Sequence, residues 1–295
     1  MDDLLQPFQI QNWLWRGHSI RYSALGSGPA LVLVHGFGAS IGHWRKNIPT
    51  LVEAGYRVYT VDLLGFGGSD KPPSGYSLDL WTELLADFWR EHIQVPATFT
   101  GNSIGALISL TMVARYPEMA AGGILINCAG GLSHRSQEMN PIAGLMIGTF
   151  TKLAGSPISG PFIFDLIRQR RRIRRTLTQV YNDPAAITDE LVEILYQPTC
   201  DPGAYKAFAS IVTAPPGAAP EDLLPIVQRP LLVLWGDKDP WTPVSRGLTF
   251  EQWVPDGISY TFQPIPNAGH CPHDEVPEVV NGLMIDWLGS QIDQR

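Results

Sequence analysis

The pentapeptide GNSIG (residues 101–105) stands between an apolar run, ATFTGNS (97–103), and a helix-like stretch, IGALISLTMVARY (104–116). A serine on a sharp strand-to-helix turn is exposed at the carboxyl edge of a sheet, with its hydroxyl close to a helix N-terminus. Glycines must flank it, because a Cβ at either position would clash across the turn. The sequence therefore predicts a nucleophile, Ser103, on a strand–turn–helix unit.

Short apolar runs alternate with helical patterns on both sides of this motif. The further runs are FQIQNWLW (8–15), ALVLVHGF (30–37), YRVYTVDL (56–63), GGILINCA (122–129), PLLVLWGD (230–237) and ISYTFQPI (258–265). Several are continuously apolar, as expected for strands that are buried on both faces. Helical patterns include LDLWTELLADFWREH (78–92) and EVVNGLMIDWLGSQI (278–292). The alternation predicts an α/β fold with a mostly parallel sheet flanked by helices.

The alternation stops after Cys128, and the chain is helical and rich in punctuating prolines until about residue 212. A Pro/Gly/Ala loop, TAPPGAAP (213–220), then leads back to an apolar run. We predict an α/β core formed by residues 1–127 and 213–295, with an inserted helical cap at residues 128–212. The cap holds 9 Lys and Arg against 7 Asp and Glu, whereas the whole chain has a formal charge of −7.

Composition excludes several classes of protein. The 295 residues are 44% hydrophobic, which is too apolar for a disordered chain, and the negative charge disfavours nucleic-acid binding. Three cysteines without a metal spacing are typical of a reducing compartment. The start, MDDLLQPFQI, predicts no signal peptide, and no apolar run is long enough to span a membrane. We expect a cytoplasmic protein that needs no metal or other cofactor.

The motif HGFG (35–38) ends an early apolar run and can direct backbone N–H groups into a site. The amides of Phe37 and Ile104 are the candidate oxyanion hole. The alternative is that this motif is only a tight exit from a strand.

The acid and the base come from the C-terminal part of the chain. Asp237 and Asp239 follow the run at 230–237, and the spacing from Gly236 favours Asp239 as the acid that orients a histidine. Of the two histidines that follow, His270 completes the order serine, aspartate, histidine that this fold requires, and His273 is interpreted as a helix-start or surface residue.

These motifs resemble, in the same order, those of the capped α/β-hydrolases. They are HGFGAS (35–40), DLLGFGGSDKP (62–72), GNSIG (101–105), GDKDPWTP (236–243) and NAGHCPHDEVPE (267–278). The resemblance implies an eight-stranded, mostly parallel sheet, with Ser103 as nucleophile, Asp239 as acid and His270 as base. Capped dehalogenases and epoxide hydrolases share DLLGFGGSDKP but carry an aspartate nucleophile, so Ser103 argues against both chemistries.

Among serine enzymes the chain resembles the cyanobacterial and plastid group of pheophytinase and chlorophyll dephytylase, through GNSIG, LLGFGGSDKP and GHCPHDEVPE. This implies hydrolysis of the phytyl ester of a chlorophyll-type pigment, a phytylated tetrapyrrole. We expect Asn102 and Trp241 to contact the substrate. Two alternatives stay open: C–C bond hydrolysis, because meta-cleavage product hydrolases also use a GNS motif, and a ligand receptor or scaffold that retains the triad.

The cap has two further features. Residues 139–151 and 153–164 are uncharged and apolar, which fits either cap core or a lid that receives an apolar chain or touches a bilayer. Six of the eight residues at 168–175 are arginines, which fits either a solvated helix face or contact with anionic lipid. We expect peripheral contact with a thylakoid-like membrane through the cap.

Overall fold

The computed structural model describes residues 8–132 and 141–292 and contains an eight-stranded sheet in the order β1-β2-β4-β3-β5-β6-β7-β8. The strands are β1 (Gln11–Trp15), β2 (His18–Leu25), β3 (Ala30–Val34), β4 (Arg57–Val61), β5 (Ala97–Asn102), β6 (Ala120–Ile126), β7 (Leu231–Gly236) and β8 (Tyr260–Ile265). β2 pairs antiparallel with β1 and β4, and all the other pairs are parallel. The predicted α/β-hydrolase sheet is confirmed.

β2 is the strand that the apolar runs do not predict. Its sequence, HSIRYSAL, buries Ile20, Tyr22 and Ser23, while its other residues are half exposed. An antiparallel strand near a sheet edge needs only one apolar face, so its residues alternate instead of forming a continuous run. A turn with positive φ at Arg16 and Gly17 joins β1 to β2 as a hairpin.

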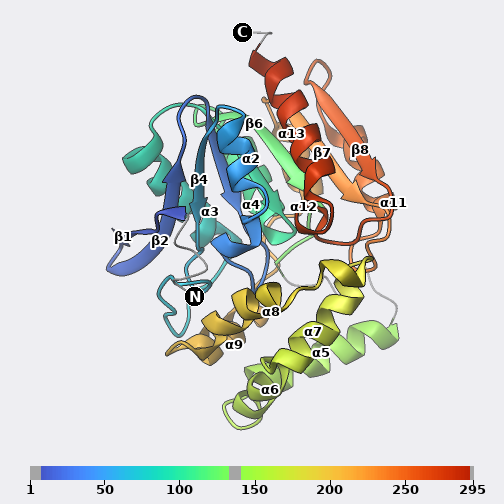
Figure 1. The fold of residues 1–295 in the computed structure, drawn as a ribbon. Helices are drawn as coiled ribbons and strands as arrows, with labels where there is room; N and C mark the ends of the chain where they lie inside the picture. Colours follow the sequence, from blue (N-terminus) through green and yellow to red (C-terminus); the bar gives the residue numbers. More distant parts are fainter. Residues whose placement is uncertain (1–7, 133–140, 293–295) are drawn as a thin grey trace.

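Helices cover both faces of the sheet (Figure 1). α3 (Leu78–Phe88) and α4 (Ile104–Arg115) enclose one apolar core that includes Trp81 and Phe88. α2 (Ile48–Glu53) and α13 (Pro277–Ile292) enclose the other, with Trp44 and Met284. The shorter helices of this part are α10 (Pro220–Leu223), α11 (Val244–Leu248) and α12 (Pro272–Glu275).

The described residues of the predicted cap form helices, which lie together at one end of the molecule (Figure 1). They are α5 (Pro141–Gly155), α6 (Gly160–Ile167), α7 (Arg170–Val180), α8 (Asp189–Tyr196) and α9 (Ala204–Val212). The Val180 carbonyl at the end of α7 accepts a hydrogen bond from the His270 amide, so the cap meets the segment that follows β8. Among the described helices, none has the length and apolarity needed to cross a bilayer.

Candidate active site

Ser103 lies on the turn between β5 and α4, with a positive φ of 59°. The two neighbouring glycines make this turn possible. A Cβ on Gly101 would lie 2.1 Å from the carbonyl oxygen of Gly105, and a Cβ on Gly105 would lie 2.2 Å from that of Val34. Both distances are far inside van der Waals contact, so the GxSxG spacing has a direct steric cause. The serine is consequently presented at the carboxyl edge of the sheet.

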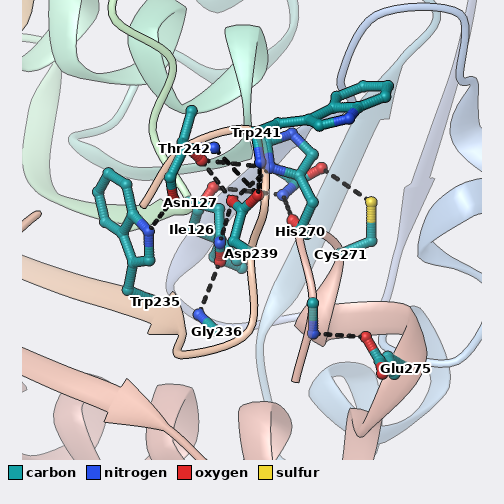
Figure 2. Close-up of polar contacts among 12 residues, drawn as sticks. Ile126, Asn127, Trp235, Gly236, Asp239, Trp241, Thr242, His270, Cys271 and Glu275 are labelled. Carbon is teal, nitrogen blue, oxygen red and sulfur yellow. Dashed lines mark hydrogen bonds and ion pairs between the residues drawn. The ribbon is translucent and has the colours of Figure 1, made fainter. Parts of the chain in front are cut away.

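His270 and Asp239 form a pair at the same edge, following β8 and β7. His270 Nδ1 lies 2.6 Å from Asp239 Oδ2 (Figure 2). The same oxygen accepts hydrogen bonds from Asn127 Nδ2 at 2.7 Å and from the Thr242 hydroxyl. The other carboxylate oxygen, Oδ1, accepts the backbone amides of Trp241 and Thr242 at 2.8 and 3.0 Å. Asp239 is therefore a fully saturated, buried acceptor.

The electrostatics of this pair favour an ionised aspartate. Burial alone would raise the pKa of Asp239, but the hydrogen bond and charge of His270 and the hydrogen bonds of Thr242 outweigh it and hold the pKa below its ordinary value. A carboxylate at Oδ2 requires the proton on Nδ1 of His270. Nε2 of the histidine is then the basic nitrogen, the one needed to take a proton from a nucleophile.

The predicted oxyanion amides are available. Among the described residues, neither the Phe37 nor the Ile104 amide donates to a protein acceptor. Gly36, next to Phe37, packs against the elbow, since a Cβ there would lie 3.4 Å from Ser103 Cβ. The loop after β3 and the start of α4 therefore meet at the serine, where two free N–H groups can receive a developing negative charge.

His35 supports this loop. Its ring is buried, Nδ1 donates to the Gly36 carbonyl at 2.8 Å, and Nε2 accepts the Leu63 amide at 3.0 Å. Burial lowers the pKa of His35, so the ring is neutral and keeps one donor and one acceptor. The histidine of the HGFG motif is a brace between two loops.

The two predicted substrate contacts differ in position. Trp241 is 50% exposed, and its ring centroid lies 5.7 Å from that of His270, so it borders the open side of the site. Asn102 is buried, and its Nδ2 donates to the carbonyls of His270 at 2.9 Å and Ile126 at 3.3 Å. In this structure the side-chain amide of Asn102 supports the histidine loop from below, and its contact with substrate stays a prediction.

Residues that the sequence did not single out also hold the site. Asn127 and Thr242 bind the acid, and Asn127 Oδ1 also accepts the Gly236 amide at 3.0 Å. Asn127 follows β6 with a positive φ of 45°, a conformation that asparagine tolerates better than most residues. An asparagine at a strand end is too common a feature to predict this role from sequence.

Glu275 connects the histidine loop to the cap. One carboxylate oxygen accepts the Gly269 amide at 2.7 Å and the other accepts the Asp183 amide at 2.6 Å. The His270 amide donates to the Val180 carbonyl at 2.8 Å. The end of α7 therefore binds the backbone amide of His270 directly, and the segment after α7 is linked to the Gly269 amide through Glu275.

His273 lies in the first turn of α12, as the helix-start interpretation predicts, but it is completely buried, so the surface alternative is wrong. Its ring contacts those of His43 and Trp44, with centroid separations of 4.6 and 4.4 Å, and neither ring nitrogen has a hydrogen-bond partner among the described residues. Burial lowers the pKa of His273 well below 6.5 and that of His43 to about 4. Aromatic packing beneath the site explains why His273 is buried. The charged residues next to it in the sequence (PHDEVPE) suggested an exposed position instead.

Replacing His273 by phenylalanine should make the protein more tolerant of acid. The folded ring stays neutral below pH 6.5 while the unfolded ring takes up a proton, so the histidine lowers the free energy of unfolding as pH falls. The free energy of unfolding of the variant minus that of wild type should rise by about 2 kcal/mol between pH 7.5 and pH 5. Urea unfolding at several pH values measures this, with His18→Phe at a half-exposed site as control. Parallel pH curves for wild type and His273→Phe would contradict the prediction.

An apolar pocket lies between the loop at Phe37 and the cap. Its lining includes Phe37, Phe66, Phe164, Leu195, Phe208 and Ile211. Ring centroids of Phe37 and Phe208 are 6.2 Å apart, and those of Phe208 and Phe164 are 5.3 Å apart. Aromatic side chains thus continue from the candidate oxyanion loop into α6 and α9, and this lining suits an apolar group.

A serine on a strand-to-helix elbow, with a histidine–aspartate pair at the ends of later strands, defines a hydrolase of the nucleophile-elbow class. Residues 31–283 match the sequence model of the alpha/beta hydrolase family, and the chain belongs to that family. The family predicted from the motifs is confirmed.

Particular relatives differ in chemistry. Chloroplastic pheophytinase of Arabidopsis thaliana is 30% identical over 88% of this chain, which spans 61% of the length of that relative. The 2-hydroxymuconate semialdehyde hydrolase of Pseudomonas sp. (strain CF600) is 26% identical, covering 84% of this chain and 81% of that protein. The crystal structure of CarC, a serine hydrolase involved in carbazole degradation, superposes with a TM-score of 0.76 at 25% identity, over 97% of this chain and 99% of that one.

Proposed function

We propose that the protein is a serine ester hydrolase that acts on a bulky, apolar carboxylic ester. The observation that carries the proposal is the His270–Asp239 pair at the same sheet edge as the Ser103 elbow, 2.6 Å between Nδ1 and Oδ2. The apolar lining of the pocket beside Phe37 supports an apolar substrate.

The proposed mechanism assigns one role to each of these residues. His270 Nε2 takes the proton of Ser103 while the serine oxygen attacks the ester carbonyl. Asp239 holds the histidine in this tautomer and stabilises its imidazolium form. The amides of Phe37 and Ile104 bind the tetrahedral oxyanion, a contribution of about 3–4 kcal/mol for each donor in comparable sites. His270 then protonates the leaving alcohol and activates the water that releases the acyl group from Ser103.

The phytyl ester of a chlorophyll-type pigment is the proposed substrate. The similarity to Arabidopsis pheophytinase supports it, together with the mostly apolar lining of the pocket. Lys71 is the charged residue among the described lining residues, and its Nζ already contacts the Asp201 carboxylate at 2.7 Å and the Gly67 carbonyl at 2.7 Å. A neutral ester suits this pocket better than an anionic substrate, since an anion would have to compete for that ammonium group.

C–C bond hydrolysis is the second candidate. The similarity to 2-hydroxymuconate semialdehyde hydrolase and the superposition with CarC favour it. The same serine, histidine and oxyanion amides are compatible with attack on a ketone carbonyl, so the substrate decides between the two reactions.

Product analysis tests the proposal. Wild type and Ser103→Ala are incubated with chlorophyll a and pheophytin a in mild detergent, and with a p-nitrophenyl ester and a 2-hydroxy-6-oxohexadienoate. Free phytol from wild type alone is the expected result. If the p-nitrophenyl ester is cleaved and no phytol is released, the esterase assignment stands and the pigment is not the substrate. Cleavage of the dienoate alone would establish the C–C hydrolase, and no cleavage at all would favour the receptor.

A further inference from the structure

Large apolar side chains are exposed on the cap, at α6 and the adjoining end of α5, two helices that lie at the cap end of the molecule (Figure 1). Ile158, in the turn between these helices, is 82% exposed, and Phe162 is 77% exposed. Three more exceed 40%: Phe150, Leu153 and Leu166. Five such side chains within 17 residues form a concentration that a monomeric soluble surface rarely carries.

The arginines of the following segment divide into two groups. One group binds carboxylates: Arg168 with Asp165, Arg170 with Glu193, and Arg174 with Asp189. Two of these acids belong to α8, so the side of α7 that bears Arg170 and Arg174 faces α8. These three arginines are accounted for by the fold.

The other group consists of Arg171, Arg172 and Arg175. All three are exposed, and none has a carboxylate partner among the residues that the structure describes. At 100° per residue they occupy a single arc of about 100°, on the part of α7 turned away from Arg170 and Arg174. The fold leaves these three charges free on one outward face.

We propose that these exposed residues form a docking face for the surface of an anionic lipid bilayer. The docking face consists of Phe150, Leu153, Ile158, Phe162, Leu166, Arg171, Arg172 and Arg175. Apolar side chains beside free arginines match the acyl boundary and the anionic headgroups of such a surface. Asp165, the acid on α6, is neutralised by Arg168 at 2.7 Å, so it does not oppose the attraction.

The positive charge of the docking face also favours a lipid surface over a second copy of the chain as its binding partner. A twofold contact through this face would bring the same unpaired arginines together, which costs energy. The chain as a whole carries a formal charge of −7, so the docking face has the sign opposite to that of the molecule. This contrast would orient the protein, with the cap toward the anionic surface and the acidic core away from it.

The docking face lies directly behind the apolar pocket. Phe164 of α6 lines the pocket, whereas Phe162 and Leu166, two residues before and after it, are exposed on the opposite side of the helix. One helix, about 10 Å across, therefore separates bilayer from pocket. The inference does not depend on which bond the site cleaves, because it rests on the outer surface alone.

Vesicle flotation tests the proposal on the full chain. We expect binding to vesicles of phosphatidylcholine mixed with phosphatidylglycerol, weaker binding to phosphatidylcholine alone, and a decrease with salt. The triple variant Arg171→Gln, Arg172→Gln, Arg175→Gln and the double variant Ile158→Ser, Phe162→Ser should each lose at least about tenfold in affinity for the anionic vesicles.

The control variants Leu14→Ser with Leu248→Ser, and Arg90→Gln with Arg115→Gln, change exposed side chains outside the cap and should bind as wild type. Unchanged hydrolysis of a p-nitrophenyl ester without vesicles shows that each variant is folded, and it also separates this proposal from the esterase assignment. Equal binding to both kinds of vesicle, no binding by wild type, or equal losses in the control variants would overturn the docking face. So would a dimer in light scattering that Ile158→Ser, Phe162→Ser abolishes while vesicles are not bound.

Discussion

Ser103→Ala should lower kcat for a p-nitrophenyl ester by a factor on the order of 10⁴ to 10⁶. The substitution removes the only hydroxyl on the elbow, so no acyl-enzyme can form. The amides of Phe37 and Ile104 remain and account for the residual rate. Substrate affinity should change little, because the apolar pocket is untouched. Initial rates, with the burst of p-nitrophenol that reports acyl-enzyme formation, measure the effect.

The loss should occur without unfolding. Ser103 Oγ makes no hydrogen bond to a described residue, and alanine has the same backbone preferences at a φ of 59°, so the free energy of unfolding should stay within about 0.5 kcal/mol. Ser109→Ala is the control: this serine lies in α4, the helix that follows Ser103, is buried, and has no hydrogen-bond partner for its hydroxyl among the residues that the structure describes. It should retain full activity. A Ser103→Ala protein that keeps a few per cent of wild-type kcat would remove Ser103 from the mechanism.

The chemistry was predictable from sequence where the chain itself fixes it. Gly101 and Gly105 are dictated by contacts of 2.1 and 2.2 Å across one turn, so five consecutive letters reveal the elbow. His270 followed from the order of motifs, since parallel strands gather their carboxyl ends at one edge of the sheet. Local sterics and topology were therefore enough to predict where most residues of the candidate site lie.

The remaining features depend on contacts between distant segments. Asn127 meets Asp239 across 112 residues, and Glu275 meets Asp183 across 92. The residues next to Asn127 and Glu275 in the sequence give no indication of these distant partners. His273 was misjudged for the same reason, because its acidic neighbours suggested a surface while the ring packs on Trp44. Burial of a polar residue is decided by tertiary packing, which a local pattern does not contain.

Asp239→Asn should reduce kcat by about 10⁴-fold, while Asp237→Asn should change it by no more than a few-fold. Asp237 is the matched control because it is two residues away, its side chain is 32% exposed, and its Oδ1 accepts only the Asn267 amide, at 2.8 Å. An asparagine oxygen can accept that bond equally well. Steady-state kinetics of both variants decide which aspartate orients His270.

The larger effect expected for Asp239→Asn than for Asp237→Asn follows from the hydrogen-bond donors around Asp239. Oδ2 accepts from His270, Asn127 and Thr242, and Oδ1 accepts from two backbone amides, so an asparagine NH₂ group faces donors in either orientation. The cost of an unsatisfied buried group, about 1–3 kcal/mol, should appear as lower stability in urea unfolding. The histidine is then free to adopt the other tautomer, with the proton on Nε2, where it cannot accept the proton of Ser103. Equal losses in the two variants would show that the buried network is structural and that the orienting acid lies elsewhere.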